Sequence, residues 1–253
     1  MTGDVEVARE DRVLRVTLNR PTKKNALTRA MYATLAAALA EAEADSAIRV
    51  VLFSGGSAVF TAGNDLNDFL ASGPDLAAVT QFITALSRAT KPMIAAVNGV
   101  AVGIGATMLL HCDLVYVGRT ASLSFPFLNL ALIPEFGSTA LLPAAIGLSR
   151  ATKLLYFGEK ISGDEAARLG MVTEAVDDEK VQDHAAAQAR LLAQRPPQAL
   201  MLTRALLRRP FADALADAIQ RELDGFARQL DSVEAREALT AVAEKRPPDF
   251  SKF

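Results

Sequence analysis

The segment that most constrains the fold is PMIAAVNGVAVGIGATMLL, which runs from Pro92 to Leu110. Its residues 93–97 are apolar and predict a short buried strand, and Asn98-Gly99 then predicts a turn. Gly103-Ile104-Gly105 opens a second apolar run that is long enough for a buried helix. A strand that leads through glycines into a helix N-terminus leaves backbone N–H groups unpaired. Those groups and the helix dipole together form an anion site.

Three interpretations of this turn are open from these residues alone. A dinucleotide pyrophosphate calls for the pattern G-x-G-x-x-G, but Met108 stands where the third glycine would be needed for close helix–strand packing. An oxyanion that forms only during a reaction, such as an ester or thioester enolate, needs a second N–H donor from elsewhere in the chain. The third interpretation is that the glycine pair merely lets a helix pack tightly.

A second donor has a candidate in an earlier segment. Residues 50–54, VVLFS, predict another buried strand, and FTAGNDL follows at 60–66 after Gly55-Gly56. Asn64 or Asp65 can cap the helix that begins there. The chain therefore contains two strand–glycine–helix units about forty residues apart, which is typical of repeated supersecondary units. Two such turns facing each other could direct two backbone donors at one oxygen.

Four groups of residues carry a resemblance to a known family: LNRP at 18–21 with NAL at 25–27, FTAGNDL at 60–66, AAVNGVAVGIGA at 95–106, and IP at 133–134. With these motifs in order, nearly the whole chain resembles the crotonase family, also called the enoyl-CoA hydratase/isomerase family, and most closely its Δ3,Δ2-enoyl-CoA isomerases. The resemblance implies an α/β fold, a crotonase-like spiral of β-β-α units with a helical C-terminal region. It divides the chain into a spiral core with the acyl-CoA site at 1–195 and a helical region for packing and oligomerisation at 196–253.

The resemblance also implies a site. Its ligand is an acyl-CoA thioester, and because coenzyme A is part of the substrate no separate cofactor is expected. The oxyanion donors are the backbone N–H groups of Asn64 and Ile104, which follow Gly63 and Gly103. Lys24 is expected to contact a phosphate, although an ordinary solvated charge is the alternative. The other residues expected to bind acyl-CoA are Ala26, Ala62, Gly63, Asp65, Leu66, Gly103 and Phe127. The family pattern implies a homotrimer or hexamer.

The carboxylates decide which reaction is expected, since oxyanion stabilisation alone does not choose one. In the hydratases that the chain resembles, two glutamates hold and split a water molecule, and their positions are occupied here by Thr107 and Phe127. Glu135 remains, between an apolar connection and the next helix, in the segment where the isomerases carry their base. Its apolar neighbours should raise the pKa of its carboxyl group towards a value useful for proton transfer. The alternative is an ordinary acidic residue at a helix N-terminus, favoured by the helix dipole.

Composition excludes several other classes. The chain has 253 residues, with 27 basic and 29 acidic side chains and a net charge of −2. It has no basic stripe, so a nucleic-acid partner is not expected, and no apolar run long enough to predict a membrane span. A single cysteine and a polar, acidic start without a signal-peptide pattern favour a cytoplasmic protein. Two histidines and one cysteine do not make a metal site, and His111-Cys112 is expected to be packed core.

The elements expected from periodicity and turn signals follow this framework. A hairpin is expected over 5–19 with its turn near Asp11, and Thr28 should cap the first helix. Arg195-Pro196-Pro197 is the expected linker. Strands are expected at 48–54, 93–97, 113–117 and 122–125, and helices at 28–45, 65–71 with a break at 72–74, 76–89, 104–111, 137–146, 149–157, 163–169, 198–207, 210–229 and 231–245.

The favoured function is therefore that of a Δ3,Δ2-enoyl-CoA isomerase, which moves a double bond through an oxyanion-stabilised dienolate. One alternative is another enolate reaction on an acyl-CoA, such as a ring opening, dehalogenation or hydrolysis, or a member grouped with the hydratases. The other is a non-catalytic acyl-CoA-binding paralogue that lost its chemistry together with the two glutamates.

Overall fold

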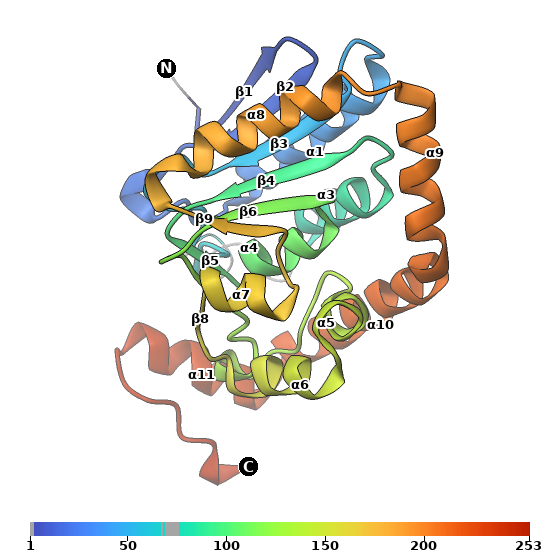
Figure 1. The fold of residues 1–253 in the computed structure, drawn as a ribbon. Helices are drawn as coiled ribbons and strands as arrows, with labels where there is room; N and C mark the ends of the chain where they lie inside the picture. The colour runs from blue at the N-terminus through green and yellow to red at the C-terminus, as the bar shows by residue number, and fades with distance from the viewer. Residues whose placement is uncertain (1–2, 67, 69–75) are drawn as a thin grey trace.

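A six-stranded sheet lies at the centre of the computed structural model, which describes residues 3–66, 68 and 76–253 (Figure 1). In spatial order its strands are β1 (Val5–Glu10), β2 (Val13–Leu18), β3 (Val50–Ser54), β4 (Met93–Val97), β6 (Leu114–Gly118) and β9 (Glu174–Val176). The pair β1–β2 is an antiparallel hairpin that turns at Asp11, and every other neighbouring pair is parallel. A parallel sheet of this kind requires crossover connections, which place helices on its faces.

Helices cover both faces of this sheet, which explains why β3 and β4 are apolar and buried along their whole length. The helices α1 (Arg29–Ala44) and α3 (Ala77–Arg88) lie on one face, and α8 (Val181–Ala193) crosses the other (Figure 1). Side chains alternate between the two cores: Val51 and Phe53 of β3 pack on the side of α1 and α3, whereas Val50 and Leu52 pack on the alanine face of α8. The period of two follows from strand geometry.

A second, three-stranded sheet gives the fold its spiral. Its order is β5 (Val100–Val102), β7 (Ser122–Ser124) and β8 (Ile161–Ser162). After β4 the chain crosses to β5 and then enters α4 (Ile104–Thr107), and after β6 it crosses again to β7. Each turn therefore places one strand in the large sheet and one in the small sheet. The predicted α/β class and spiral of β-β-α units are confirmed.

Six further helices of the described chain complete the molecule, and most of them lie below the large sheet in Figure 1. The chain continues from the small sheet through α5 (Ser138–Ile146), α6 (Leu148–Phe157) and α7 (Gly163–Leu169), and returns after α8 through α9 (Pro197–Arg208), α10 (Ala212–Leu230) and α11 (Val233–Ala243). The helix α9 runs beside the strand ends of the large sheet, and α10 continues below the sheet, where it packs on α5. None of the helices in the described chain is long and apolar enough to cross a membrane.

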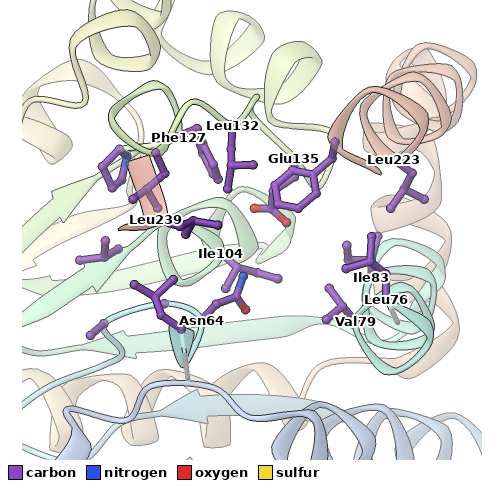
Figure 2. Close-up of a pocket in the computed structure, with 18 residues that line it drawn as sticks. Asn64, Leu76, Val79, Ile83, Ile104, Phe127, Leu132, Glu135, Leu223 and Leu239 are labelled. Carbon is purple, nitrogen blue, oxygen red and sulfur yellow. The ribbon is translucent and has the colours of Figure 1, made fainter. Parts of the chain in front are cut away.

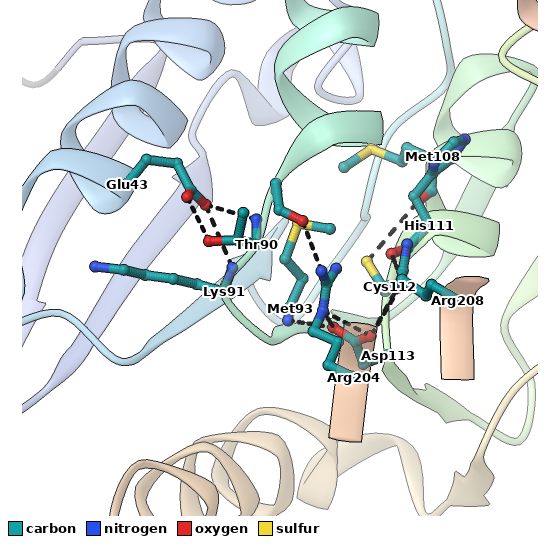
Figure 3. A network of polar contacts seen from close by, with 11 residues as sticks. Glu43, Thr90, Lys91, Met93, Met108, His111, Cys112, Asp113, Arg204 and Arg208 are labelled. Carbon is teal, nitrogen blue, oxygen red and sulfur yellow. Dashed lines mark hydrogen bonds and ion pairs between the residues drawn. The ribbon is translucent and has the colours of Figure 1, made fainter. Parts of the chain in front are cut away.

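A partly buried ion-pair network fastens α9 to the core (Figure 3). Asp113, just before β6, accepts from the Arg204 guanidinium at 2.9 Å, from that of Arg208 at 3.1 Å and from the backbone N–H of Met93 at 2.8 Å. Arg204 is 8% exposed and also donates to the carbonyl of Ala89 at 2.6 Å. Removing Asp113 would leave the buried Arg204 guanidinium without its ion-pair partner, so the network ties the helical region to the sheet.

Most of the expected elements occur with small shifts of their ends. Thr28 caps α1 by accepting from the backbone N–H of Met31, as predicted. The helix expected over 104–111 is α4 followed by a 3-10 turn at Met108–His111, which is a correction to a single helix. The helix expected over 65–71 and its break at 72–74 fall largely outside the described residues. Sequence patterns did not predict β5, β8, β9 or α8, because the strands have only two or three residues and the buried face of α8 is mostly alanine.

Candidate active site

Two glycine turns meet at one wall of a cavity. Thr61 and Ala101 form a parallel β-bridge, in which the Thr61 N–H donates to the Val100 carbonyl at 2.9 Å and the Val102 N–H donates to the Thr61 carbonyl at 3.1 Å. Asn64 and Ile104 each lie three residues beyond a partner in this bridge, and both line the same cavity (Figure 2). The two turns that the sequence places about forty residues apart are therefore adjacent in space.

Glycine is required at two positions of this junction. Gly103 has φ 55 and ψ −121, a region that residues with a Cβ rarely enter, and it is followed directly by Ile104, the first residue of α4. A Cβ at Gly105 would lie 2.4 Å from Cγ2 of Thr61, so only glycine lets α4 come this close to the first turn. The Ile104 and Asn64 N–H groups have no partner in the described part of the chain, so both remain available to an oxygen in the cavity.

Three hydrogen bonds hold the segment around Asn64. The Leu27 N–H donates to the Gly63 carbonyl at 2.8 Å, and the Asp65 N–H donates to the Leu27 carbonyl at 2.9 Å. The hydroxyl of Tyr32, which is buried on α1, donates to Oδ1 of Asn64. These bonds fix the backbone on either side of Asn64 without using its own N–H group.

Glu135 is the carboxylate of the cavity. It is 8% exposed and accepts a hydrogen bond from the Thr107 hydroxyl at 2.6 Å. Burial raises the pKa of its carboxyl group from 4.5 to about 8, the nearby Glu222 carboxylate adds to this increase, and the bond from Thr107 opposes it. A group with a pKa near the working pH exists in both protonation states, which is what a general base requires. Figure 2 shows the carboxylate across the cavity from Asn64 and Ile104.

The turn that carries Glu135 has an unusual backbone. Phe136 has φ 64, in the left-handed region that side chains with a Cβ rarely adopt. Its carbonyl accepts a hydrogen bond from Nε2 of His111 at 2.7 Å, so Nε2 carries a proton. Burial lowers the pKa of His111 to about 4, so its ring is neutral. His111 is thus core, as predicted, and it also supports this turn.

The cavity itself is apolar and measures about 160 Å³. Besides the glycine turns, α3 contributes Val79 and Ile83, α10 contributes Leu223 and Phe226, and α11 contributes Leu239. The segment between β7 and α5 supplies the remaining wall, which consists of Pro126, Phe127, Leu130 and Leu132. Among the described lining residues, Glu135 carries the only titratable side chain. A dry space of about 150 Å³ is large enough for a benzene ring, so the cavity suits a small apolar group.

The structure brings most of the sequence-predicted site residues together. The cavity is lined by Ala62, Gly63, Asn64, Leu66, Gly103, Ile104, Phe127 and Glu135. Lys24, Ala26 and Asp65 lie outside it. Lys24 is exposed and its carbonyl accepts from the Ala62 N–H at 2.9 Å, whereas the Asp65 carboxylate pairs with Arg20 at 2.7 Å. Arg20 also donates to the Ala26 carbonyl at 3.0 Å.

Several residues of the site were not predicted as part of it. Thr107, which stands where the hydratases carry a glutamate, bonds the Glu135 carboxylate directly. Tyr32, Glu222 and Leu239 come from helices that no motif marks as functional. A signal did exist for Glu222, since it occupies an apolar-face position of a helix whose buried side includes Ala218 and Phe226.

Comparisons with known proteins agree with this geometry. The family model for enoyl-CoA hydratase/isomerase matches residues 8–252. The chain belongs to the enoyl-CoA hydratase/isomerase family. A solved enoyl-CoA hydratase/isomerase from Pseudoalteromonas atlantica has the same fold, with a TM-score of 0.94 and 38% identity over 98% of this chain and 100% of that one.

Relatives within the family carry different activity names. The chain is 37% identical to the 1,2-epoxyphenylacetyl-CoA isomerase of Escherichia coli, over 96% of each chain. It is 34% identical to the 2,3-dehydroadipyl-CoA hydratase of the same organism, over 98% of each chain. A peroxisomal enoyl-CoA delta isomerase of Mus musculus is 31% identical over 81% of this chain and 67% of its own length. These relatives belong to one family but are named for different reactions.

Proposed function

We propose that this protein is an enoyl-CoA isomerase, which converts a 3-enoyl-CoA into the conjugated 2-enoyl-CoA. The observation that carries the proposal is that Glu135, the single carboxylate among the described lining residues, lies in an apolar cavity with two adjacent backbone donors. Thr107 and Phe127 stand at the positions where the hydratases that the chain resembles carry the two glutamates that hold and split water. One shuttling carboxylate is sufficient to move a proton, whereas hydration also needs a positioned water molecule.

The proposed mechanism uses the two donors and one base. The thioester carbonyl accepts hydrogen bonds from the N–H groups of Asn64 and Ile104, which makes the C2 protons more acidic. Glu135 removes a proton from C2, the electron pair shifts to give a dienolate, and Glu135 returns the proton at C4. Negative charge on the carbonyl oxygen is greatest in the dienolate, so each donor contributes most to the transition state, by about 2.7–4 kcal/mol. The substrate already contains coenzyme A, and the proton balance is closed without another cofactor.

A second candidate is favoured by the 37% identity to 1,2-epoxyphenylacetyl-CoA isomerase. A cavity of about 160 Å³ accommodates a ring, and the same donors and base would serve another isomerisation that passes through an enolate-like oxyanion. The two candidates share the machinery and differ in the acyl group, so a panel of aliphatic 3-enoyl-CoA and epoxyphenylacetyl-CoA substrates separates them.

The decisive experiment follows conjugation of 3-enoyl-CoA by absorbance in the wild type, Glu135→Gln and the control Glu179→Gln. Glutamine keeps the size of the side chain but cannot take a proton, so the rate should fall by about 10²–10⁴-fold. The control removes an exposed carboxylate and should keep full activity. Because the base acts in its ionised form, wild-type kcat should rise with pH through the Glu135 pKa of about 8.

Three results would count against the isomerase assignment. A Glu135→Gln variant that isomerises at the wild-type rate would remove the proposed base. A wild type that binds acyl-CoA but is inert on both substrates would favour a binding paralogue. Hydration of crotonyl-CoA at the rate of a dedicated hydratase would reveal an acid–base pair that the cavity does not show.

A further inference from the structure

A second buried carboxylate lies behind the turn that carries Glu135. Glu222 on α10 is 4% exposed, and the described residues give it no ion pair. In the described chain, all the hydrogen bonds of its side chain go to residues at the start of α5. The Gly137 N–H donates to Oε2 at 2.5 Å, and the N–H and hydroxyl of Thr139 donate to Oε1 at 2.9 and 2.5 Å. Both carboxylate oxygens are therefore engaged by one short segment.

These bonds replace a cap that α5 lacks. The residue that caps α5 is Gly137, which has no side chain to accept from the first N–H groups of the helix. Glu222 supplies this acceptor from a helix that lies more than eighty residues away in sequence, at |i−j| of 83 to 85. Its negative charge at a helix N-terminus is also favoured by the helix dipole.

The same carboxylate clamps the peptide unit next to Glu135. The carbonyl of Phe136 and the N–H of Gly137 belong to one peptide plane. His111 donates to the carbonyl at 2.7 Å and Glu222 accepts from the N–H at 2.5 Å. Phe136 has φ 64, a conformation that persists only where the surroundings hold it. The two contacts hold this plane at both ends, one residue beyond Glu135.

We propose that Glu222 is a positioning residue: by clamping the Phe136–Gly137 peptide it fixes the direction in which Glu135 enters the cavity. This inference rests on the proposed function, in which Glu135 is the base. Glu222 is not among the residues that line the cavity, so it acts through the turn rather than on the substrate.

An electrostatic effect accompanies the positioning. The Glu222 carboxylate raises the pKa of Glu135 and so makes it a stronger base. The other polar groups that face Glu135 in the described chain are neutral: the Thr107 hydroxyl, the Tyr32 hydroxyl, whose own pKa is raised by burial, and the His111 ring. Removing the charge of Glu222 should therefore lower the pKa of Glu135.

The first test compares kcat, KM and the pH profile of the wild type, Glu222→Gln and the control Asp224→Asn. Displacement of a reacting group by about 1 Å costs on the order of 100-fold in rate, so Glu222→Gln should lose about tenfold or more in kcat at the high-pH plateau. Its KM should stay near the wild-type value and its pH midpoint should move down. Asp224→Asn removes an exposed charge from the same helix and should behave as the wild type.

A second readout needs no activity. Folding raises the Glu135 pKa from 4.5 to about 8, so the folded protein keeps a proton that the unfolded chain has released. The stability of the wild type relative to Glu135→Gln should consequently fall as pH rises from 4.5 to about 8. Measured again in the Glu222→Gln background, this fall should end at a lower pH.

The two readouts distinguish the inference from the proposed function. If the wild type is inert on 3-enoyl-CoA but the stability curves shift as described, the isomerase assignment fails and the coupling of Glu222 to Glu135 stands. An unchanged kcat in folded Glu222→Gln overturns the inference, and so does a lower kcat with an unmoved pH midpoint, which would be a structural effect alone.

If Glu222→Gln does not fold, Thr139→Val removes one of the groups that donate to the Glu222 carboxylate. A lower kcat with unchanged KM then supports the inference, and an unchanged kcat overturns it.

Discussion

At the scale of single residues, the Thr107 hydroxyl lowers the pH at which Glu135 becomes ionised. Its bond of 2.6 Å goes to a carboxylate that burial would otherwise keep protonated to a higher pH. A hydrogen bond to the ionised form favours that form and lowers the pKa. Thr107 therefore keeps part of the base ionised near neutral pH.

This role predicts the behaviour of Thr107→Val, which keeps the shape of the side chain and removes the donor. The pKa of Glu135 should rise above its value of about 8, so kcat at pH 7 should fall by about tenfold for each unit of increase, while the rate at the highest pH stays close to wild type. A stopped assay over a pH series measures both ends of the profile. Thr107→Ser keeps the hydroxyl and serves as the control. A uniform loss of rate at every pH would assign Thr107 a different role.

Sequence motifs could single out Asn64, Ile104 and Glu135, which all line the cavity, because each lies within a local pattern of glycines, strand and helix start. Their roles as donors and base stay predictions. His111 and Glu222 were beyond such reasoning, because their contacts with the Phe136–Gly137 peptide depend on tertiary packing between segments far apart in the chain.

At the scale of elements, α4 packs closely against the first glycine turn where Gly105 faces Thr61. The absent side chain of Gly105 leaves room for the methyl group of Thr61, which a Cβ would approach to 2.4 Å. The Thr61 hydroxyl is engaged elsewhere, donating to the Asn25 carbonyl at 2.6 Å and accepting from the Gly63 N–H at 3.1 Å. The methyl group is therefore the nearest obstacle to a Cβ at Gly105, and the Thr61 carbonyl oxygen follows at 3.3 Å.

Gly105→Ala should push the two turns apart and misplace both oxyanion donors. Loss of one such donor costs about 10²–10³-fold in kcat, and a loss of that order is expected here. Thr61→Ser removes the methyl group and keeps both hydroxyl contacts, so the double variant Gly105→Ala/Thr61→Ser should recover most of the activity. Steady-state kinetics on the two single variants and the double variant complete the cycle. Failure of the rescue would place the defect outside this contact.

The element pattern was predictable where an element is long or has a marked end, as for α1 with its Thr28 cap and for the apolar strands β3 and β4. It failed for β5, whose three residues become a strand only by pairing with β7. It also failed for α8, since a helix that buries alanines against a sheet has little contrast between its faces.

At the scale of the whole molecule, the helical region is part of the site. The helices α10 and α11 close the cavity with Leu223, Phe226 and Leu239, and α9 is fastened to the core through Asp113. The division at residue 195 that the family resemblance implies stays a prediction, and the contacts across it are extensive.

The exposed side of α9 carries large apolar side chains, as expected of a surface that contacts another protomer in the predicted trimer or hexamer. Leu202, Leu206 and Leu207 are 66%, 73% and 69% exposed, and an apolar surface of this kind is typical of a protein–protein contact. Sedimentation velocity at micromolar concentration should give three or six protomers. Leu206→Glu should shift the distribution to smaller species, whereas Gln198→Lys, on the exposed start of the same helix, should not. A wild type that sediments as a monomer would contradict the prediction.

Because α10 and α11 come late in the sequence, the cavity wall that they form is synthesised after the rest of the site. During synthesis the sheet, both glycine turns and Glu135 leave the ribosome before Glu222, Leu223 and Leu239 do. A nascent chain can therefore form its large sheet while the clamp on the Phe136–Gly137 peptide and one wall of the cavity are still missing. Under the proposed function, we therefore expect the site to become able to bind and deprotonate a thioester only after α10 and α11 have been synthesised and have packed against it.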